Sequence, residues 1–395
     1  MKKILFVAYG GGHINTLLPI AKKLDPSSYE VCFFALTTSI DKLKQTDFKY
    51  YTYRDFFYSD EVQGYGKKIT AGLDTIKLND EESISYLGQN YLELVQTHGA
   101  VEADKLYRKS NRQIFEPIKS MEYVLKKINP DLVVSTSSPR SEKCIIQAAG
   151  KLGIKSIALI DLFAVRCISW FKKNNFANKV CVFSTMVKSY LTLNGRNEAD
   201  IMVTGNPVFD QLANNSNAAK KQNDVYRVLW ASQKEPEYFA EFGTHGNSNL
   251  PLEIEKKLIE IFKDKKWTLV VRNHPNEESR KYPDFVEISA SSTKLIETLN
   301  SVDLVITCTS TVGLEGLILG KDLITIDMSV ITPTIPFSKY GYSVGINNLD
   351  QLADSIKKMY DNRKLKKKRK YSIKNATENV IVEIEKLLKT NNKSD

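Results

Sequence analysis

Residues 3–24, KILFVAYGGGHINTLLPIAKKL, join an apolar run to three glycines, a histidine and a segment with helical periodicity. A short apolar run bounded by glycines is typical of a buried β-strand, and the spacing of the later apolar residues is typical of an amphipathic helix. A strand that turns directly into a helix is the repeating unit of a parallel sheet covered by helices. This stretch therefore predicts an α/β fold.

The same alternation continues along the chain in two series. The first series continues with the apolar runs DLVVST (131–136), IKSIALID (154–161), VCVFS (180–184) and IMVTG (201–205). After the polar, aperiodic residues 213–224 a second series contains YRVLWAS (226–232), WTLVVR (267–272), DFVEIS (284–289), DLVITC (303–308) and DLITID (322–327). Helical segments follow most of these runs. Two such series predict two doubly wound, Rossmann-like domains joined by a linker.

We expect an amino-terminal domain over residues 1–205, a carboxyl-terminal domain over 206–365 and a basic helix or tail over 366–395. Residues from about 54 to 128 interrupt the first series. They begin with the aromatic, glycine-containing and irregular segment YRDFFYSDEVQGYGKKITAGLD (53–74) and continue as long helical stretches, which we interpret as an insertion suited to holding a substrate. Ligands of open parallel sheets bind beyond the carboxyl ends of the strands, so the two domains are expected to face each other across a cleft.

The cysteines and the hydropathy pattern restrict the class of protein. The five cysteines are widely spaced and form no C-x-x-C pair, a pattern that fits a reduced compartment and argues against a zinc site or a disulfide framework. No run of 18 apolar residues occurs, and the amino-terminal stretch lacks the features of a signal peptide. We therefore expect a soluble, cytoplasmic protein.

The net charge of +10 is concentrated in residues 357–370, KKMYDNRKLKKKRK, which hold nine Lys or Arg residues and one Asp. A solvated helix face is one interpretation of this run. Attraction to an anionic membrane surface, such as the inner face of the cell membrane, or to a lipid-linked phosphate is another. Nucleic acid is an unlikely partner because few aromatic residues are interleaved and no nucleic-acid-binding motif occurs.

The second domain contains a candidate phosphate site in VITCTSTVGLEGLILGKDLITID, residues 305–327. Thr309, Ser310 or Thr311 can cap the helix that follows the strand, and a capped helix N-terminus binds phosphate readily. Glu315 falls one turn into this helix, where its carboxylate could reach ribose hydroxyls. A plain capped helix, with Glu315 completing a pair similar to a capping box, is the alternative.

The segment LVVRNHPNEES, residues 269–279, places Arg272 and His274 at the end of another strand of this domain. Pro275 prevents a helix from starting immediately. Arginine can bind a phosphate through two N–H groups, and histidine can donate to one. A structural loop histidine is the alternative interpretation of His274.

The segment IMVTGNPVFD, residues 201–210, ends a strand with Gly205, Asn206 and a proline. Glycine permits a tight turn and a close approach of the backbone, and proline fixes the direction in which the chain leaves. A hinge and a ligand-lining turn are both compatible with this pattern.

Two residues of the first domain are candidate bases. His13 follows the glycines at the start of the first helix, a position that favours a neutral imidazole able to accept a proton. Asp161 ends another strand and is the second candidate, although it could equally cap a helix or loop. The segment GGGHINT (10–16) matches neither the G-x-G-x-x-G spacing nor the P-loop, so a dinucleotide or P-loop site is weakly indicated.

The segments GGGHINTLLPIAKKL, VTGNPVFD, HPN and TSTVGLEGLILGK together resemble the GT-B superfamily of nucleotide-sugar enzymes. This superfamily includes the peptidoglycan N-acetylglucosaminyltransferase, capsule and teichoic-acid transferases, GT-B sialyltransferases and UDP-N-acetylglucosamine 2-epimerases. The four segments occur in the expected order over most of the chain. The resemblance implies a GT-B fold and an enzyme that takes a UDP- or CMP-linked sugar as substrate, with no metal or other cofactor.

The resemblance also implies roles for individual residues. Residues that match the glycine loop, the interdomain turn and the nucleotide-binding segments of the family are Gly11, Gly12, Gly205, Asn206, His274, Pro275, Ser310, Thr311 and Glu315. His13 corresponds to a base or to a group that stabilises an oxyanion. The chemistry of Arg272 makes it a further contact to the departing phosphate.

Departures from the family pattern separate its branches. The chain has no counterpart of the HVEAGLR or GDR segments of the epimerases, and its amino-terminal half lacks the acidic motif of the CMP-dependent sialyltransferases. We therefore expect a metal-independent, inverting glycosyltransferase that moves a sugar onto a capsule, lipopolysaccharide or lipid-linked acceptor. The alternatives are a UDP-N-acetylglucosamine 2-epimerase-like isomerase or hydrolase and a CMP-nonulosonic acid transferase.

Overall fold

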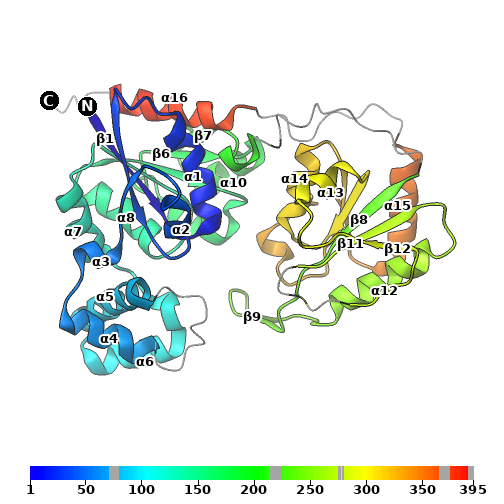
Figure 1. Ribbon diagram of the computed structural model, residues 1–395, viewed down its shortest axis with the longest axis horizontal. Coiled ribbons are helices and arrows are strands. Elements are labelled where there is room, and N and C mark those ends of the chain that lie inside the picture. The colour runs from blue at the N-terminus through cyan, green and yellow to red at the C-terminus, as the bar shows by residue number, and fades with distance from the viewer. Residues whose placement is uncertain are drawn as a thin grey trace. The chain divides into compact units, whose positions relative to one another are not determined.

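A computed structural model describes residues 1–70, 80–210, 212, 225–274, 277, 280–363 and 374–389. The chain forms two compact units, Met1–Val208 with Asn375–Asp395 and Phe209–Lys374 (Figure 1). Residues 206–208 therefore belong to the first unit, and the chain returns to that unit at its carboxyl-terminal end. The predicted linker, residues 213–224, lies outside the described residues.

The first unit contains a parallel sheet with strand order β3-β2-β1-β4-β5-β6-β7. Its strands are β1 (Lys2–Ala8), β2 (Tyr29–Ala35), β3 (Lys49–Tyr51), β4 (Leu132–Ser135), β5 (Lys155–Ile160), β6 (Lys179–Val182) and β7 (Ile201–Val203). The helices around the sheet are α1 (Gly11–Lys23), α2 (Ser39–Leu43), α8 (Ser141–Lys151), α9 (Ile168–Phe171), α10 (Thr185–Leu193) and α16 (Ala376–Lys389). Strands β2 and β3 were not among the predicted runs.

The core of this unit explains why its strands are continuous apolar runs. In β1 all positions from Ile4 to Ala8 are buried, because both faces of the sheet are covered. On one face Phe6 packs with Leu17 of α1 and with Val380 and Ile384 of α16. The last helix is thus part of the core of the first unit (Figure 1).

The insertion is helical almost from its start, so the expectation of an irregular beginning was wrong. Its helices are α3 (Tyr53–Phe56), α4 (Asp60–Thr70), α5 (Asp80–His98), α6 (Ala100–Ser110) and α7 (Ile118–Ile128). Gly66 and Gly88 are packing residues rather than turn residues, because a Cβ on Gly66 would lie 2.2 Å from the carbonyl oxygen of Ile84 and one on Gly88 would lie 1.9 Å from that of Val62. They allow α4 and α5 to pack closely.

The second unit contains a parallel sheet with strand order β12-β11-β8-β13-β14-β15 and a separate hairpin of β9 and β10. Its strands are β8 (Arg227–Ala231), β9 (Tyr238–Phe239), β10 (Thr244–His245), β11 (Thr268–Arg272), β12 (Val286–Ile288), β13 (Leu304–Thr307), β14 (Asp322–Ile326) and β15 (Val344–Ile346). The helices are α12 (Leu250–Phe262), α13 (Leu295–Asn300), α14 (Thr311–Ile318) and α15 (Leu352–Asp361). Short 3₁₀ helices in the two units are η1 (Asn111–Ile114), η2 (Ala164–Cys167), η3 (Glu198–Asp200), η4 (Pro207–Phe209), η5 (Thr332–Thr334) and η6 (Leu349–Gln351).

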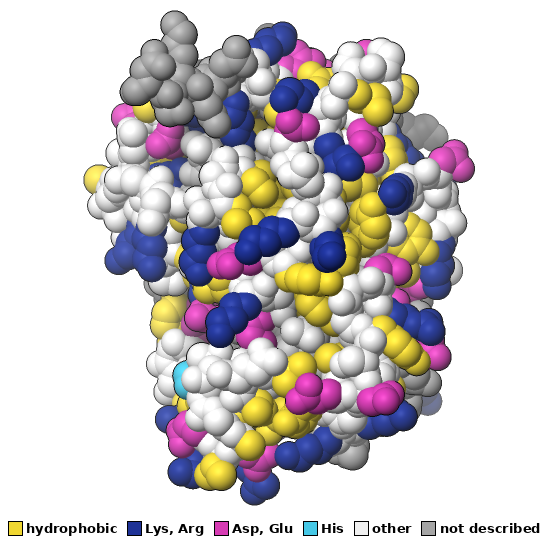
Figure 2. Space-filling model, turned by 90° about the vertical axis from the view of Figure 1, so that its left-hand side faces the viewer, with side chains coloured by type: hydrophobic (Ala, Val, Ile, Leu, Met, Phe, Trp, Pro, Cys, Tyr) yellow, Lys and Arg dark blue, Asp and Glu magenta, His cyan; other side chains and the backbone are white. Residues whose placement is uncertain are grey.

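The carboxyl-terminal tail and the surface bear on the expected partners. Helix α16 starts at Ala376, whereas residues 364–370 of the basic run lie outside the described residues. On the face drawn in Figure 2, basic and acidic side chains are interspersed, which is typical of a solvated surface. Within the described ranges no helix is both long and apolar enough to span a bilayer.

Candidate functional site

Each sheet has one point where the strand order reverses, and the residues after the strands at that point are the first candidates for a ligand site. In the first unit this point lies between β1 and β4, and in the second unit between β8 and β13. The segments that follow β1, β4, β8 and β13 are residues 9–13, 136–142, 232–235 and 308–311, respectively. His13, Ser310 and Thr311 lie in these segments.

A buried carboxylate, Glu142, organises the reversal point of the first unit. Its side chain is fully buried, and Oε1 accepts a hydrogen bond from the Tyr9 backbone N–H at 2.7 Å. Oε2 accepts the Thr136 hydroxyl at 2.5 Å and the Ser138 backbone N–H at 3.1 Å. Glu142 therefore joins the loop after β1 to the loop after β4.

The same hydroxyl connects Glu142 to His13. Nδ1 of His13 is hydrogen-bonded to Oγ1 of Thr136 and lies 3.9 Å from Oε2 of Glu142. Because the single hydroxyl proton of Thr136 is donated to the carboxylate, its oxygen must accept from Nδ1–H of the imidazole. In the neutral imidazole this arrangement places the proton on Nδ1 and leaves Nε2 as the nitrogen that can accept a proton.

His13 is the third residue of α1, and its side chain is one-quarter exposed. The N-cap residue Gly10 gives the helix no side-chain cap, and the N–H of Gly11 donates to Oγ1 of Thr38 at 3.0 Å. A Cβ on Gly12 would have no protein atom within 4 Å among the described residues. The protein's own packing therefore does not require glycine at position 12.

Asp161 lies at the same edge of the sheet but has different partners. Its Oδ1 accepts the Ser137 hydroxyl at 2.9 Å, and its backbone oxygen accepts Nδ2 of Asn206 at 2.8 Å. Gly205 has a φ of 83°, a conformation that favours glycine. The structure thus brings Asp161 and Asn206 together in the first unit, whereas His13 is connected to Glu142.

Sequence analysis did not identify Glu142 or Thr136. The available signal was the polar run TSSPRSE (136–142) between a buried strand and a helix, with an acidic residue in the first turn of that helix. This pattern alone is typical of an ordinary helix start. The role of Glu142 depends on Tyr9 and His13, which lie more than 120 residues earlier in the sequence.

In the second unit Ser310 is the N-cap of α14, and its hydroxyl accepts the Val312 N–H at 3.3 Å. Thr311 is the exposed first residue of the helix. Gln233, which follows β8, makes two hydrogen bonds to Thr309 across the reversal point. Its Oε1 accepts the Thr309 backbone N–H at 3.0 Å, and its Nε2 donates to Oγ1 of Thr309 at 2.6 Å. The start of α14 is thereby held beside the end of β8.

Glu315 lies one turn into α14 and is mostly buried. Burial raises the pKa of its carboxyl to about 7, and the nearby Arg272 guanidinium opposes this shift. Arg272 itself donates from Nη1 to Oγ of Ser289 at 2.7 Å and to the backbone oxygen of Ala290 at 3.2 Å. The structure therefore brings Arg272 and Glu315 to one side of α14.

The other histidine candidate is less constrained. His274 is exposed, and its backbone N–H donates to Oε2 of Glu277 at 2.9 Å. Pro275 lies outside the described residues. Across the described part of the chain no group of three or more His, Cys, Asp or Glu side chains could hold a metal ion.

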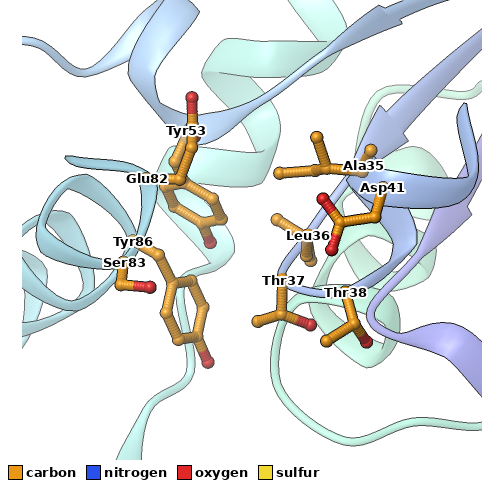
Figure 3. Close-up of a pocket in the computed structure, with 10 residues that line it drawn as sticks. Ala35, Leu36, Thr37, Thr38, Asp41, Tyr53, Glu82, Ser83 and Tyr86 are labelled. Atoms are coloured by element: carbon orange, nitrogen blue, oxygen red, sulfur yellow. The ribbon is translucent and has the colours of Figure 1, made fainter. Parts of the chain in front are cut away.

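A pocket adjoins the glycine loop of the first unit (Figure 3). It has a volume of about 80 Å³ and lies between the segment after β2, which includes Thr37, Thr38 and Asp41, and the insertion, which supplies Tyr53, Glu82, Ser83 and Tyr86. The hydroxyl of Thr37 donates to the backbone oxygen of Tyr9.

The lining of this pocket is polar and aromatic. Burial raises the pKa of Glu82, which accepts a hydrogen bond from Thr52 at 2.9 Å. Aromatic rings, hydroxyls and carboxylates suit a hydroxylated ligand such as a sugar.

No family model and no curated protein matches the sequence. Solved structures do match the fold. A complex of S. aureus MnaA with UDP is 15% identical with a TM-score of 0.60, covering 98% of this chain and 97% of that chain. A UDP-N-acetylglucosamine 2-epimerase from Neisseria meningitidis bound to UDP-N-acetylglucosamine is 14% identical with a TM-score of 0.57, covering 97% and 100%. A glycosyltransferase from Rickettsia africae is 14% identical with a TM-score of 0.54, covering 99% of both chains. The chain therefore has the GT-B-like fold of these structures, built from two Rossmann-like units, as the sequence predicted.

Proposed function

We propose that this protein is an enzyme acting on a nucleoside-diphosphate sugar, and that it breaks the bond between the anomeric carbon and the diphosphate. The observation that carries the proposal is the hydrogen-bonded series Glu142–Thr136–His13 at the reversal point of the first sheet. It holds Nδ1 of the imidazole through Thr136 against a buried carboxylate, so that Nε2 is the nitrogen that can accept a proton. This is the arrangement that a general base requires.

The nucleotide is assigned to the second unit. The N-terminus of α14 suits a phosphate, and Glu315 lies where a carboxylate can accept hydrogen bonds from ribose hydroxyls. Arg272 adds a positive charge near Glu315. We favour a uridine nucleotide over CMP because two of the matched structures hold UDP or UDP-N-acetylglucosamine.

Glycosyl transfer is the first candidate reaction, and the pocket beside the glycine loop favours it because a transferase needs a place for a second substrate. In this reaction Nε2 of His13 takes the proton of an acceptor hydroxyl. The acceptor oxygen forms a bond to the anomeric carbon, and the nucleoside diphosphate leaves with the electron pair of the broken C–O bond. Arg272 and the start of α14 stabilise the charge that develops on the diphosphate.

The second candidate is 2-epimerisation or hydrolysis of UDP-N-acetylglucosamine without an acceptor. The comparisons favour this reaction more directly than they favour transfer, because the Neisseria meningitidis structure is a 2-epimerase with its sugar nucleotide bound. It uses the same nucleotide site and also requires a base.

Incubation of the full chain with UDP-N-acetylglucosamine alone, followed by proton NMR, separates the two reactions. A 2-epimerised product identifies the epimerase, and turnover only after addition of a glycan acceptor identifies the transferase. In either case His13→Ala should lower kcat by about 10²–10⁴-fold and change UDP affinity less than twofold. The matched control is His98→Ala, at an exposed position of the insertion, which should behave as wild type. Failure of the wild-type chain to bind any nucleotide sugar or UDP would refute the proposal.

A further inference from the structure

Arg140 lies beside the candidate base in a strained backbone conformation. It is the N-cap of α8, two residues before Glu142, with φ 68° and ψ −119°. Residues other than glycine rarely adopt such angles, and where they do, the strain often accompanies a functional role. In the described part of the protein, the Arg140 side chain makes no hydrogen bond that would hold the backbone at these angles.

The guanidinium of Arg140 is positioned but not neutralised. It lies 4.9 Å from the centre of the Tyr9 ring, a cation–π contact. Its Nε is buried and has no hydrogen-bond acceptor, and among the described residues no carboxylate forms an ion pair with it. A buried N–H group without an acceptor is costly, so an acceptor that binds here would relieve this cost.

Tyr86 provides a second donor beside Tyr9. The two rings are 5.9 Å apart, and the Tyr86 side chain is 5% exposed. Its hydroxyl is buried and makes no hydrogen bond of standard geometry in the described structure, although it lies close enough to the Tyr9 side chain to interact with it. Burial raises the pKa of Tyr86, Tyr9 adds to this shift and Arg140 opposes it, so the phenol and the guanidinium lie within electrostatic range of each other.

The start of α1 adds further donors. Tyr9 is followed directly by the helix start, where the backbone N–H groups of Gly12 and His13 have no acceptor among the described residues. The positive end of the helix dipole lies at the same place. Arg140, Tyr86 and the start of α1 therefore place donors and positive charge around Tyr9, while the neighbouring Glu142 carboxylate already accepts three hydrogen bonds.

We propose that Arg140, Tyr86 and the start of α1 form an anion-binding subsite of the first unit, which binds a phosphate or carboxylate group of the second substrate. Tyr86 also lines the pocket of Figure 3, together with Glu82 one turn earlier in α5 and with Asp41 on the facing segment. These carboxylates would repel an anion, so the acidic group binds at the Tyr9 end and the hydroxyl-bearing part of the ligand at the Glu82 end. The substrate class is thus an acidic or phosphorylated saccharide.

This inference rests on the proposed function, because it assigns the acceptor of the transfer reaction, and its test uses separate probes for the two substrates. Binding of D-glucuronate, sn-glycerol 3-phosphate, neutral D-glucose and UDP to the full chain is measured by NMR titration. We expect at least one acidic probe to bind about tenfold more tightly than glucose. Whether the carboxylate or the phosphate probe binds more tightly identifies the group.

Arg140→Gly is the decisive variant, because glycine accepts the backbone angles that strain arginine. It should weaken binding of the acidic probe at least about tenfold, change UDP affinity less than twofold, and raise the melting temperature by about 3 °C. Tyr86→Phe should weaken acidic-probe binding about threefold to tenfold without loss of stability. The control variant Arg112→Gln, at an exposed cation of the insertion, should change none of these values.

Unchanged binding of the acidic probes in Arg140→Gly, or no preference of the wild type for them over glucose, would overturn the inference. A parallel loss of UDP affinity in Arg140→Gly would also overturn it, because the anion would then be the nucleotide's own phosphate. Failure of the proposed function would give a different result, because UDP would then bind neither the wild type nor Arg140→Gly.

Discussion

Replacing Thr136 with valine removes the hydroxyl that connects His13 to Glu142 while keeping the size of the side chain. Without it, Nδ1–H of His13 has no acceptor, because Oε2 of Glu142 is 3.9 Å away. The imidazole then loses both its fixed tautomer and its orientation. We expect kcat with the nucleotide sugar to fall by about 10²-fold, with UDP affinity unchanged because the nucleotide is assigned to the second unit.

The effect on stability can be estimated from the same contacts. A hydrogen bond to a charged group contributes about 1.5–3 kcal/mol. Glu142 retains the bonds from Tyr9 and Ser138, so a loss of about 1.5 kcal/mol is expected, which lowers the melting temperature by about 3–6 °C. Thr136→Ser keeps the hydroxyl and is the matched control. Initial-rate kinetics of Thr136→Val within threefold of wild type, or equal losses in both variants, would refute the role of Thr136.

Two further predictions concern the second unit and the insertion. The pKa of Glu315 is raised to about 7 from 4.5, so the folded state binds the proton more tightly than the unfolded state. The free energy of unfolding should therefore fall as pH rises from about 4.5 to 7 and then level off. Glu315→Gln should remove this pH dependence in urea unfolding, and an unchanged pH profile would contradict the assignment. Gly66→Ala places a Cβ against the carbonyl oxygen of Ile84 and should lower the free energy of unfolding by about 2 kcal/mol. Gly64→Ala, in the same helix but with no atom within 4 Å, should raise it by up to about 1 kcal/mol, and equal effects of the two substitutions would argue against close packing of α4 on α5.

The fold was predictable because its central strands are buried on both faces and are therefore continuous apolar runs, as in β1. Two of the strands that were not predicted show the limit of this signal. Strands β3 and β15 are three residues long and lie at sheet edges, where less of each residue is buried. Strand β2 was missed although it is seven residues long, lies inside the sheet and is buried over its last four residues. Gly66, in the segment predicted to be irregular, was misinterpreted because it has a packing partner only once α4 and α5 are paired.

The candidate site was predictable where one segment contains all its parts. The cap Ser310 and the acid Glu315 lie on one helix, and their spacing could be recognised directly. Glu142 and Thr136 acquire their role through the pairing of β1 with β4, which brings His13 to residues more than 120 positions away. No local pattern carries that information, because strand order is a property of the whole sheet.

The return of the chain to the first unit has a consequence for biosynthesis. Val380 and Ile384 belong to the same core as β1, yet residues 209–374 are translated in between. At about 5–20 residues per second the ribosome needs roughly 10–30 s for this interval. During that time a nascent first unit exposes the apolar surface that α16 later covers, so the second unit can complete its own folding before the first one does, and a chaperone that shields this surface would act in that window.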